Sequence, residues 1–166
     1  ELLSIIDEDS INIKILSTKS KIKFLYKDIV LISKVIDGKF PDYEKVIPND
    51  ERIDAKANVE DFVSALDRLK SLSSDRKGVI KISVDKGLMK FLINDAISGD
   101  GIEEVQAQYD GQKMEIGFNS TYLIDVANVL ESKEITLMLK DATSPIRVKD
   151  EKDPLSAYIV MPMRVI

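Results

Sequence analysis

The fold is decided by residues 58–72, which read NVEDFVSALDRLKSL. Apolar residues recur in this stretch at intervals of three and four, among them Phe62, Leu66 and Leu72, and this is the spacing of one helix face. Asn58 precedes the run as a helix N-cap, and Asp61 three residues later resembles the second half of a capping box. The stretch therefore predicts an amphipathic helix of about four turns, whose apolar face packs on a sheet.

Strand patterns surround this helix in an order that repeats. The first set is a β-rich run at 52–57, the helix, and further runs at 79–84, 88–93 and 102–109. The second set is a run at 114–118, a helix capped by Asn119, and runs at 134–139, 146–149 and 156–161. Asp110-Gly111 is typical of a β-hairpin turn. The order predicts an α+β fold of repeated βαβββ units, with antiparallel sheets on one side and paired helices on the other.

The first 48 residues repeat only part of this unit. Residues 1–6 have the pattern of a helix end without a capping residue, and β-rich runs follow at 11–16, 21–26 and 29–35. A loop that contains Gly38, Pro41 and Pro48 then interrupts the pattern. We expect residues 1–48 to be the second part of a domain whose beginning is not in the chain, and residues 49–166 to be a complete domain.

Composition excludes several kinds of chemistry. The 166 residues include no cysteine and no histidine, which excludes disulfides, histidine acid-base catalysis and nearly all zinc sites. The acidic residues lie in turns and strand ends without the spacing of a metal site, so a carboxylate-dependent phosphodiesterase is disfavoured. We therefore expect no enzyme activity and no cofactor. No stretch approaches the roughly 20 apolar residues of a membrane span, and a cytoplasmic location is expected.

The chain ends in an unusually apolar segment, residues 157–166, which read AYIVMPMRVI. Pro162 cannot donate to a sheet ladder, so a strand has to end near it. Two interpretations stay open at this point. The segment is either a last core strand with a loosely packed end or one wall of a groove that receives a partner's side chains.

The net charge of −5 argues against a protein that coats nucleic acid with basic residues, but it allows a local basic surface. Arg68, Lys70 and Lys77 lie on or just after the first helix. They are either a solvated helix face or a contact to DNA phosphates, and direct DNA binding through this helix remains the alternative function.

Four motifs together resemble a known family. They are DGKFPDY at 37–43, GFN at 117–119 followed by Tyr122 and Leu123, DATSP at 141–145, and YIVMPMR at 158–164. In this combination and spacing they resemble the bacterial sliding clamp, the β subunit of DNA polymerase III. The resemblance implies a three-domain chain that closes head to tail as a homodimeric ring around double-stranded DNA. Residues 1–48 would then be the second half of the middle domain, and residues 49–166 the complete third domain.

The resemblance also implies a groove that binds short peptide motifs of the polymerase III catalytic subunit, the clamp loader, other polymerases and repair enzymes. It assigns to this groove Pro41, Lys45, Val46, Asn119, Tyr122, Thr143, Ile159, Met161, Pro162, Met163, Arg164 and Val165. It assigns to the ring interface Leu69, Leu72, Asp100, Glu103 and Glu104, and to the DNA-facing wall Arg68, Lys70 and Lys77. The chain departs from the family in ending with Val165 and Ile166 and in having few acids at the interface.

Overall fold

The computed structural model describes residues 4–6, 12–40, 42–48, 51–72, 78–95, 97 and 99–164. The chain forms two compact units, Glu1–Pro41 and Asp42–Ile166. The expected boundary after Pro48 is therefore not the boundary between the compact units. The reason is that the short 3-10 helix η1 (Tyr43–Lys45) and the residues after it belong to the second unit, where Val46 and Pro48 line a pocket together with Pro145.

The first unit contains a small antiparallel sheet of three strands, in the order β1 (Lys14–Ser17), β2 (Lys21–Tyr26) and β3 (Ile29–Lys34). The three predicted strands are thus confirmed, although β1 begins later than expected and residue 11 lies outside the described residues. The predicted helix end is wrong for Ser4 and Ile5, which form a turn. A single helical turn is unstable without packing from neighbouring elements. Residues 1–3 lie outside the described part.

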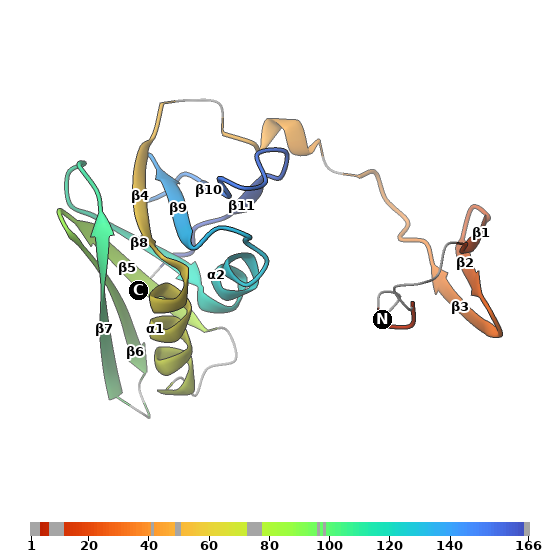
Figure 1. The fold of residues 1–166 in the computed structure, drawn as a ribbon, viewed down its shortest axis with the longest axis horizontal. Coiled ribbons are helices and arrows are strands. Elements are labelled where there is room, and N and C mark those ends of the chain that lie inside the picture. Colours follow the sequence, from red (N-terminus) through yellow and green to blue (C-terminus); the bar gives the residue numbers. More distant parts are fainter. Residues whose placement is uncertain are drawn as a thin grey trace. The chain divides into compact units, whose positions relative to one another are not determined.

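The second unit contains the two predicted βαβββ repeats (Figure 1). The first repeat consists of β4 (Ile53–Asn58), α1 (Val59–Leu72), β5 (Val79–Asp85), β6 (Leu88–Asp95) and β7 (Gly99–Gln108). The second consists of β8 (Met114–Asn119), α2 (Ser120–Ala127), β9 (Glu134–Leu139), β10 (Ile146–Lys149) and β11 (Tyr158–Val160). The strands form one antiparallel series in the order β11-β10-β9-β4-β7-β6-β5-β8.

The two repeats exchange their first strands. Strand β4 of the first repeat pairs with β9 of the second, and β8 of the second pairs with β5 of the first. The hairpin expected at Asp110-Gly111 is therefore wrong, because β7 pairs with β6 and β4 and not with β8. The connection is instead fixed by Tyr109, whose hydroxyl donates to the Gln112 carbonyl over 2.9 Å.

Both helices lie against the same side of the sheet and contact each other (Figure 1). Each begins at an asparagine that ends the preceding strand. Asn58 Oδ1 accepts from the amides of Glu60 and Asp61, and Asn119 Oδ1 accepts from the amide of Thr121. The apolar face of α1 is buried, and the Phe62 ring meets the Phe91 ring of β6 edge to face with centroids 5.2 Å apart. This packing holds the two helices in place on the sheet and so decides which of their residues face solvent.

Candidate functional site

The end of the chain connects the two edges of the sheet. Strand β11 pairs with β10 at one edge and ends at Val160, one residue before the predicted end. The chain then passes through Met161 and Pro162, and the Met163 amide donates to the Gly117 carbonyl of β8 over 2.8 Å. Gly117 and Met163 form an isolated antiparallel bridge. The segment 161–163 therefore connects β11 and β8, the two edge strands of the sheet, and Pro162 interrupts any regular strand pairing.

Each of three pockets is lined in part by residues of the segment 161–163, which is their common wall. The Tyr122 pocket, of about 380 Å³, is lined by Tyr122, Asp125, Val126, Ile159, Val160, Met161, Pro162 and Met163. The Thr143 pocket, of about 610 Å³, is lined by Lys81, Glu115, Ile116, Gly117, Ala142, Thr143, Pro162, Met163 and Arg164. The Val46 pocket, of about 690 Å³, is lined by Lys45, Val46, Ile47, Pro48, Arg52, Pro145 and Met161.

The structure thus gathers nine of the twelve residues expected in a peptide groove around one short segment. These nine are Lys45, Val46, Tyr122, Thr143, Ile159, Met161, Pro162, Met163 and Arg164. Asn119 lines none of the three pockets and instead caps α2. Pro41 and Val165 lie outside the described residues.

The wall offers apolar surface to solvent. Met161 is 57% exposed, Met163 36% and Tyr122 60%, while the neighbouring Val160 is buried in the core. The core-strand interpretation therefore holds for the first part of the apolar end, and the groove interpretation stays a prediction for the residues that follow. Tyr158–Val160 is the last strand of the sheet, and Met161 and Met163 are exposed side chains that border the pockets.

The sequence analysis missed several residues of these pockets. Asp125 and Val126 lie three and four residues after Tyr122 on α2 and share its pocket, so helical spacing alone carried a signal for them. Lys81 and Glu115 come from the adjacent strands β5 and β8 and form an ion pair of 3.2 Å. No local pattern in the sequence indicates that these two residues reach the end of the chain.

The loop that carries Thr143 is held by one carboxylate. Asp141 Oδ2 accepts from the Ser144 hydroxyl over 2.7 Å, and Oδ1 accepts from the amide and hydroxyl of Thr143, both over 2.8 Å, and from the Ser144 amide. These hydrogen bonds, that of the Ser144 hydroxyl first, hold the pKa of Asp141 well below its ordinary value. The loop therefore presents Thr143 to its pocket in a fixed conformation.

The residues expected at the ring interface and at the DNA-facing wall meet on α1 and β7. Arg68 Nη2 donates to Glu103 Oε2 over 2.7 Å, which raises the pKa of Arg68 and lowers that of Glu103. Leu69 is only 1% exposed, so it belongs to the core and not to a contact surface. Leu72, in contrast, is 44% exposed. Leu69 faces the core because it lies on the buried face of α1 together with Phe62 and Leu66.

The remaining residues of these two sets lie at the surface. Asp100 and Lys70 are exposed, and Glu104 forms an ion pair of 2.6 Å with Lys90. Lys77 lies outside the described residues. Helix α1 carries three acidic and two basic residues. Its surface is therefore not the strongly basic one that direct DNA binding through this helix requires.

Within the described residues, no three acidic side chains lie close enough together to hold a metal ion. None of the described helices combines the length and the apolar character needed to cross a membrane.

Comparisons with known proteins agree with the motifs. A family model described as the C-terminal domain of the DNA polymerase III beta subunit matches residues 44–164. The beta sliding clamp of Caulobacter vibrioides is 37% identical over 145 residues, which are 87% of this chain and 39% of that protein. The beta sliding clamp of Escherichia coli K12 is 30% identical over 165 residues, or 99% of this chain and 45% of that protein.

Solved structures give the same result for the fold. A DnaN sliding clamp of Bartonella birtlesii bound to griselimycin has a TM-score of 0.80 at 38% identity, covering 92% of this chain and 41% of that one. A sliding clamp of Pseudomonas aeruginosa has a TM-score of 0.81 at 32% identity, covering 99% of this chain and 45% of that one. The expected fold class is thus confirmed. The chain spans less than half the length of these relatives.

Proposed function

The chain belongs to the DNA polymerase III β-subunit family, and from this premise we propose that it forms part of a sliding clamp, a processivity factor of DNA replication. In the complete protein, residues 1–48 would be the second half of the middle domain and residues 49–166 the third domain. Two such proteins would close head to tail as a ring around double-stranded DNA. The clamp would have no catalytic site of its own and would act in the cytoplasm.

The observation that carries this proposal is the exposed apolar wall at Met161–Met163, which borders three pockets. A peptide side chain that enters such a pocket gains about 1.5–3 kcal/mol when it is fully buried, and two or three of them support exchangeable binding. The replicative polymerase, the clamp loader and repair enzymes would dock here in turn. By the family resemblance, the proposed groove would also include Pro41, Asn119 and Val165.

Ring closure and DNA contact are assigned to residues on and near α1 and β7. Leu72, Asp100, Glu103 and Glu104 would meet the first domain of the partner subunit, with Leu69 supporting Leu72 from the core. Arg68, Lys70 and Lys77 would face the DNA phosphates. A ring holds DNA by its topology, so a few basic residues on the inner wall are sufficient and the chain as a whole can stay acidic.

Retention on DNA of different topology tests the clamp proposal. The full-length protein is loaded by a clamp loader onto nicked circular DNA, and the circles are then cut once by a restriction enzyme. We expect the protein to stay on the circles at moderate salt and to leave after cutting. Equal retention on circular and linear DNA would contradict a topological link and would favour direct binding through the helix.

A further inference from the structure

A second surface continues from the proposed docking wall onto the outer face of the sheet. Beyond the Thr143 pocket lies a further pocket of about 260 Å³, lined by Ser83, Asp85, Lys86, Leu88, Lys90, Leu92, Lys113 and Glu115. The two pockets share Glu115. In the strand register Ser83 lies opposite Glu115, and Lys81 lies opposite Gly117. Since alternate residues of a strand face the same side of a sheet, these four residues form one surface, which begins beside Met163.

We call this surface, from Gly117 through Glu115 to Lys113, the outer track. The residues around the outer track carry more positive than negative charge, whereas the whole chain is acidic. The residues that line its two pockets include five cations, namely Lys81, Lys86, Lys90, Lys113 and Arg164. They include only the two acids Asp85 and Glu115, whereas the whole chain has a net charge of −5.

Part of this positive charge is not neutralised by the protein. Lys81 is paired with Glu115, and Lys90 with Glu104. In the part of the chain that the structure describes, Lys86 and Lys113 form no ion pair with another residue. These two lysines stand at the far end of the outer track, where Leu88, which lies opposite Asp85 in the strand register, adds apolar surface.

We propose that the outer track binds an acidic segment of the docking partner that directly adjoins the partner's apolar motif. This inference rests on the proposed peptide-docking function. The Thr143 pocket and the Tyr122 pocket both include Pro162 and Met163, so one peptide can pass from the apolar wall onto the track. From Gly117 to Lys113, the residue before β8, the chain advances by four residues, about 13 Å at ~3.3 Å per residue. An extension of about five residues therefore reaches Lys113.

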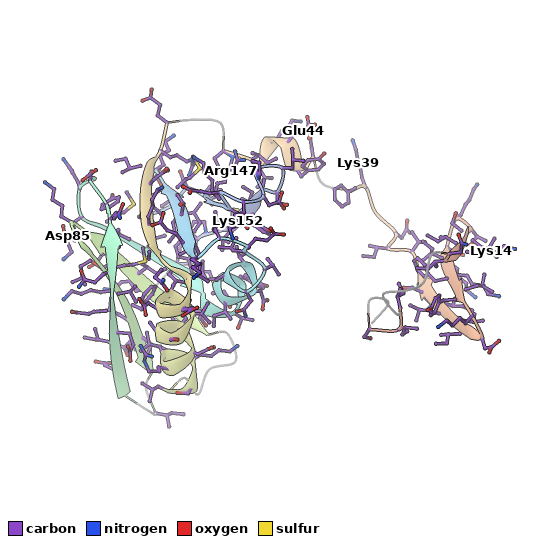
Figure 2. The ribbon with its side chains drawn as sticks, in the orientation of Figure 1. Lys14, Lys39, Glu44, Asp85, Arg147 and Lys152 are labelled. Atoms are coloured by element: carbon purple, nitrogen blue, oxygen red, sulfur yellow. The ribbon has the colours of Figure 1, made fainter. Side chains whose placement is uncertain are left out.

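A peptide suits the track better than a nucleic acid because acids interrupt its positive charge. Glu115 lies in the middle, and Asp85, which Figure 2 labels, ends β5 beside the far lysines. A nucleic acid carries a charge at every phosphate and would meet both carboxylates. A peptide can place an acid beside Lys113 and an uncharged residue beside Glu115.

Three labelled peptides test the inference on the full-length protein by fluorescence anisotropy at low and moderate salt. The first is the apolar docking motif of the polymerase alone, the second adds five residues containing three acids, and the third replaces these acids by their amides. We expect the acidic extension to tighten binding about threefold to tenfold at low salt, and this gain should shrink as salt is added. The double variant Lys86→Gln, Lys113→Gln should remove the gain and leave the affinity of the motif alone unchanged.

The matched control is Lys133→Gln, Lys152→Gln, which removes the same charge from two exposed lysines that do not line the track. If the motif binds and the acidic and amide extensions bind equally well, the outer track is refuted while the docking wall stands. If the motif itself does not bind, the docking wall fails and the track fails with it. Loss of the gain in the control variant, or competition by single-stranded oligonucleotide for the track lysines, also overturns the assignment to an acidic peptide.

Discussion

Replacing Met161 and Met163 together by alanine tests the docking wall directly. Met161 is 57% exposed and Met163 36%, and a docked peptide would cover these exposed parts. Complete burial of a methionine side chain is worth about 1.5–3 kcal/mol, so the exposed fractions of the two side chains correspond to about 1.4–2.8 kcal/mol together. Because ~1.4 kcal/mol is a tenfold change in Kd, we expect the double variant to bind the motif peptide about 10- to 100-fold more weakly.

The assay is fluorescence anisotropy of the labelled motif peptide with the full-length protein. Leu155→Ala is the matched control, because Leu155 is 97% exposed but lines none of the three pockets. Its peptide affinity should equal that of the unmodified protein. Urea unfolding establishes that the double variant is folded. A folded double variant that binds the peptide within about twofold of the unmodified protein would refute the reasoning, because the exposed methionine surface would then contribute no more than ~0.4 kcal/mol to docking.

Three further predictions concern the framework around the site. Gly101→Ala should destabilise the protein by about 1–3 kcal/mol in urea unfolding, because an added Cβ would lie 2.7 Å from Cδ2 of the buried Leu69, whereas Gly38→Ala, with nothing within 4 Å, should not. Phe62→Ala should cost about 3–5 kcal/mol in the same assay, since Phe62 is fully buried. Asp141→Asn should also lower stability. The hydrogen bonds to the ionised Asp141 carboxylate lower its pKa in the folded protein and stabilise the fold. This stabilisation is fully present above the pKa of the unfolded chain, ~3.9, and is lost as the pH falls through the lower pKa of the folded protein. The difference between the Asn variant and the unmodified protein should therefore be constant above about pH 5 and shrink in more acidic solution, and a difference that grew with acid would contradict this.

Local signals were sufficient to predict the two α-helices and the strands of the second unit, although not the short helix η1. Phe62 and Leu66 mark one helix face by their spacing, and the asparagines Asn58 and Asn119 mark both helix starts. These signals depend on residues within one turn of each other, so they can be read without knowing the fold. The same holds for the apolar end of the chain, where Pro162 predicts that the strand stops.

Non-local relations could not be predicted in this way. Asp110-Gly111 has the composition of a hairpin turn, yet the strands on either side of it pair elsewhere in the sheet. Leu69 and Leu72 both lie on the apolar stripe of α1, and only the position of the sheet decides that the first is buried and the second exposed. The contribution of Lys81 to the Thr143 pocket likewise follows from strand order, which no single segment encodes.

The position of the site follows from the internal symmetry of the second unit. The two repeats place β4 and β8 in equivalent positions, and β7 and β11 likewise. Strand β4 pairs with β7 through Lys56 with Gln108 and Ala57 with Ala107. The equivalent contact in the second repeat is the single bridge of Gly117 with Met163, and the next antiparallel position opposite Phe118 is Pro162.

Proline has no amide hydrogen to donate, so the second contact cannot extend into a ladder as the first does. The segment 161–163 therefore crosses the surface where a paired strand would otherwise lie, and its methionine side chains remain partly exposed beside the pockets. The proposed docking wall lies where the second repeat departs from the first. This departure explains why the apolar end of the chain is buried at Val160 and exposed at Met161 and Met163.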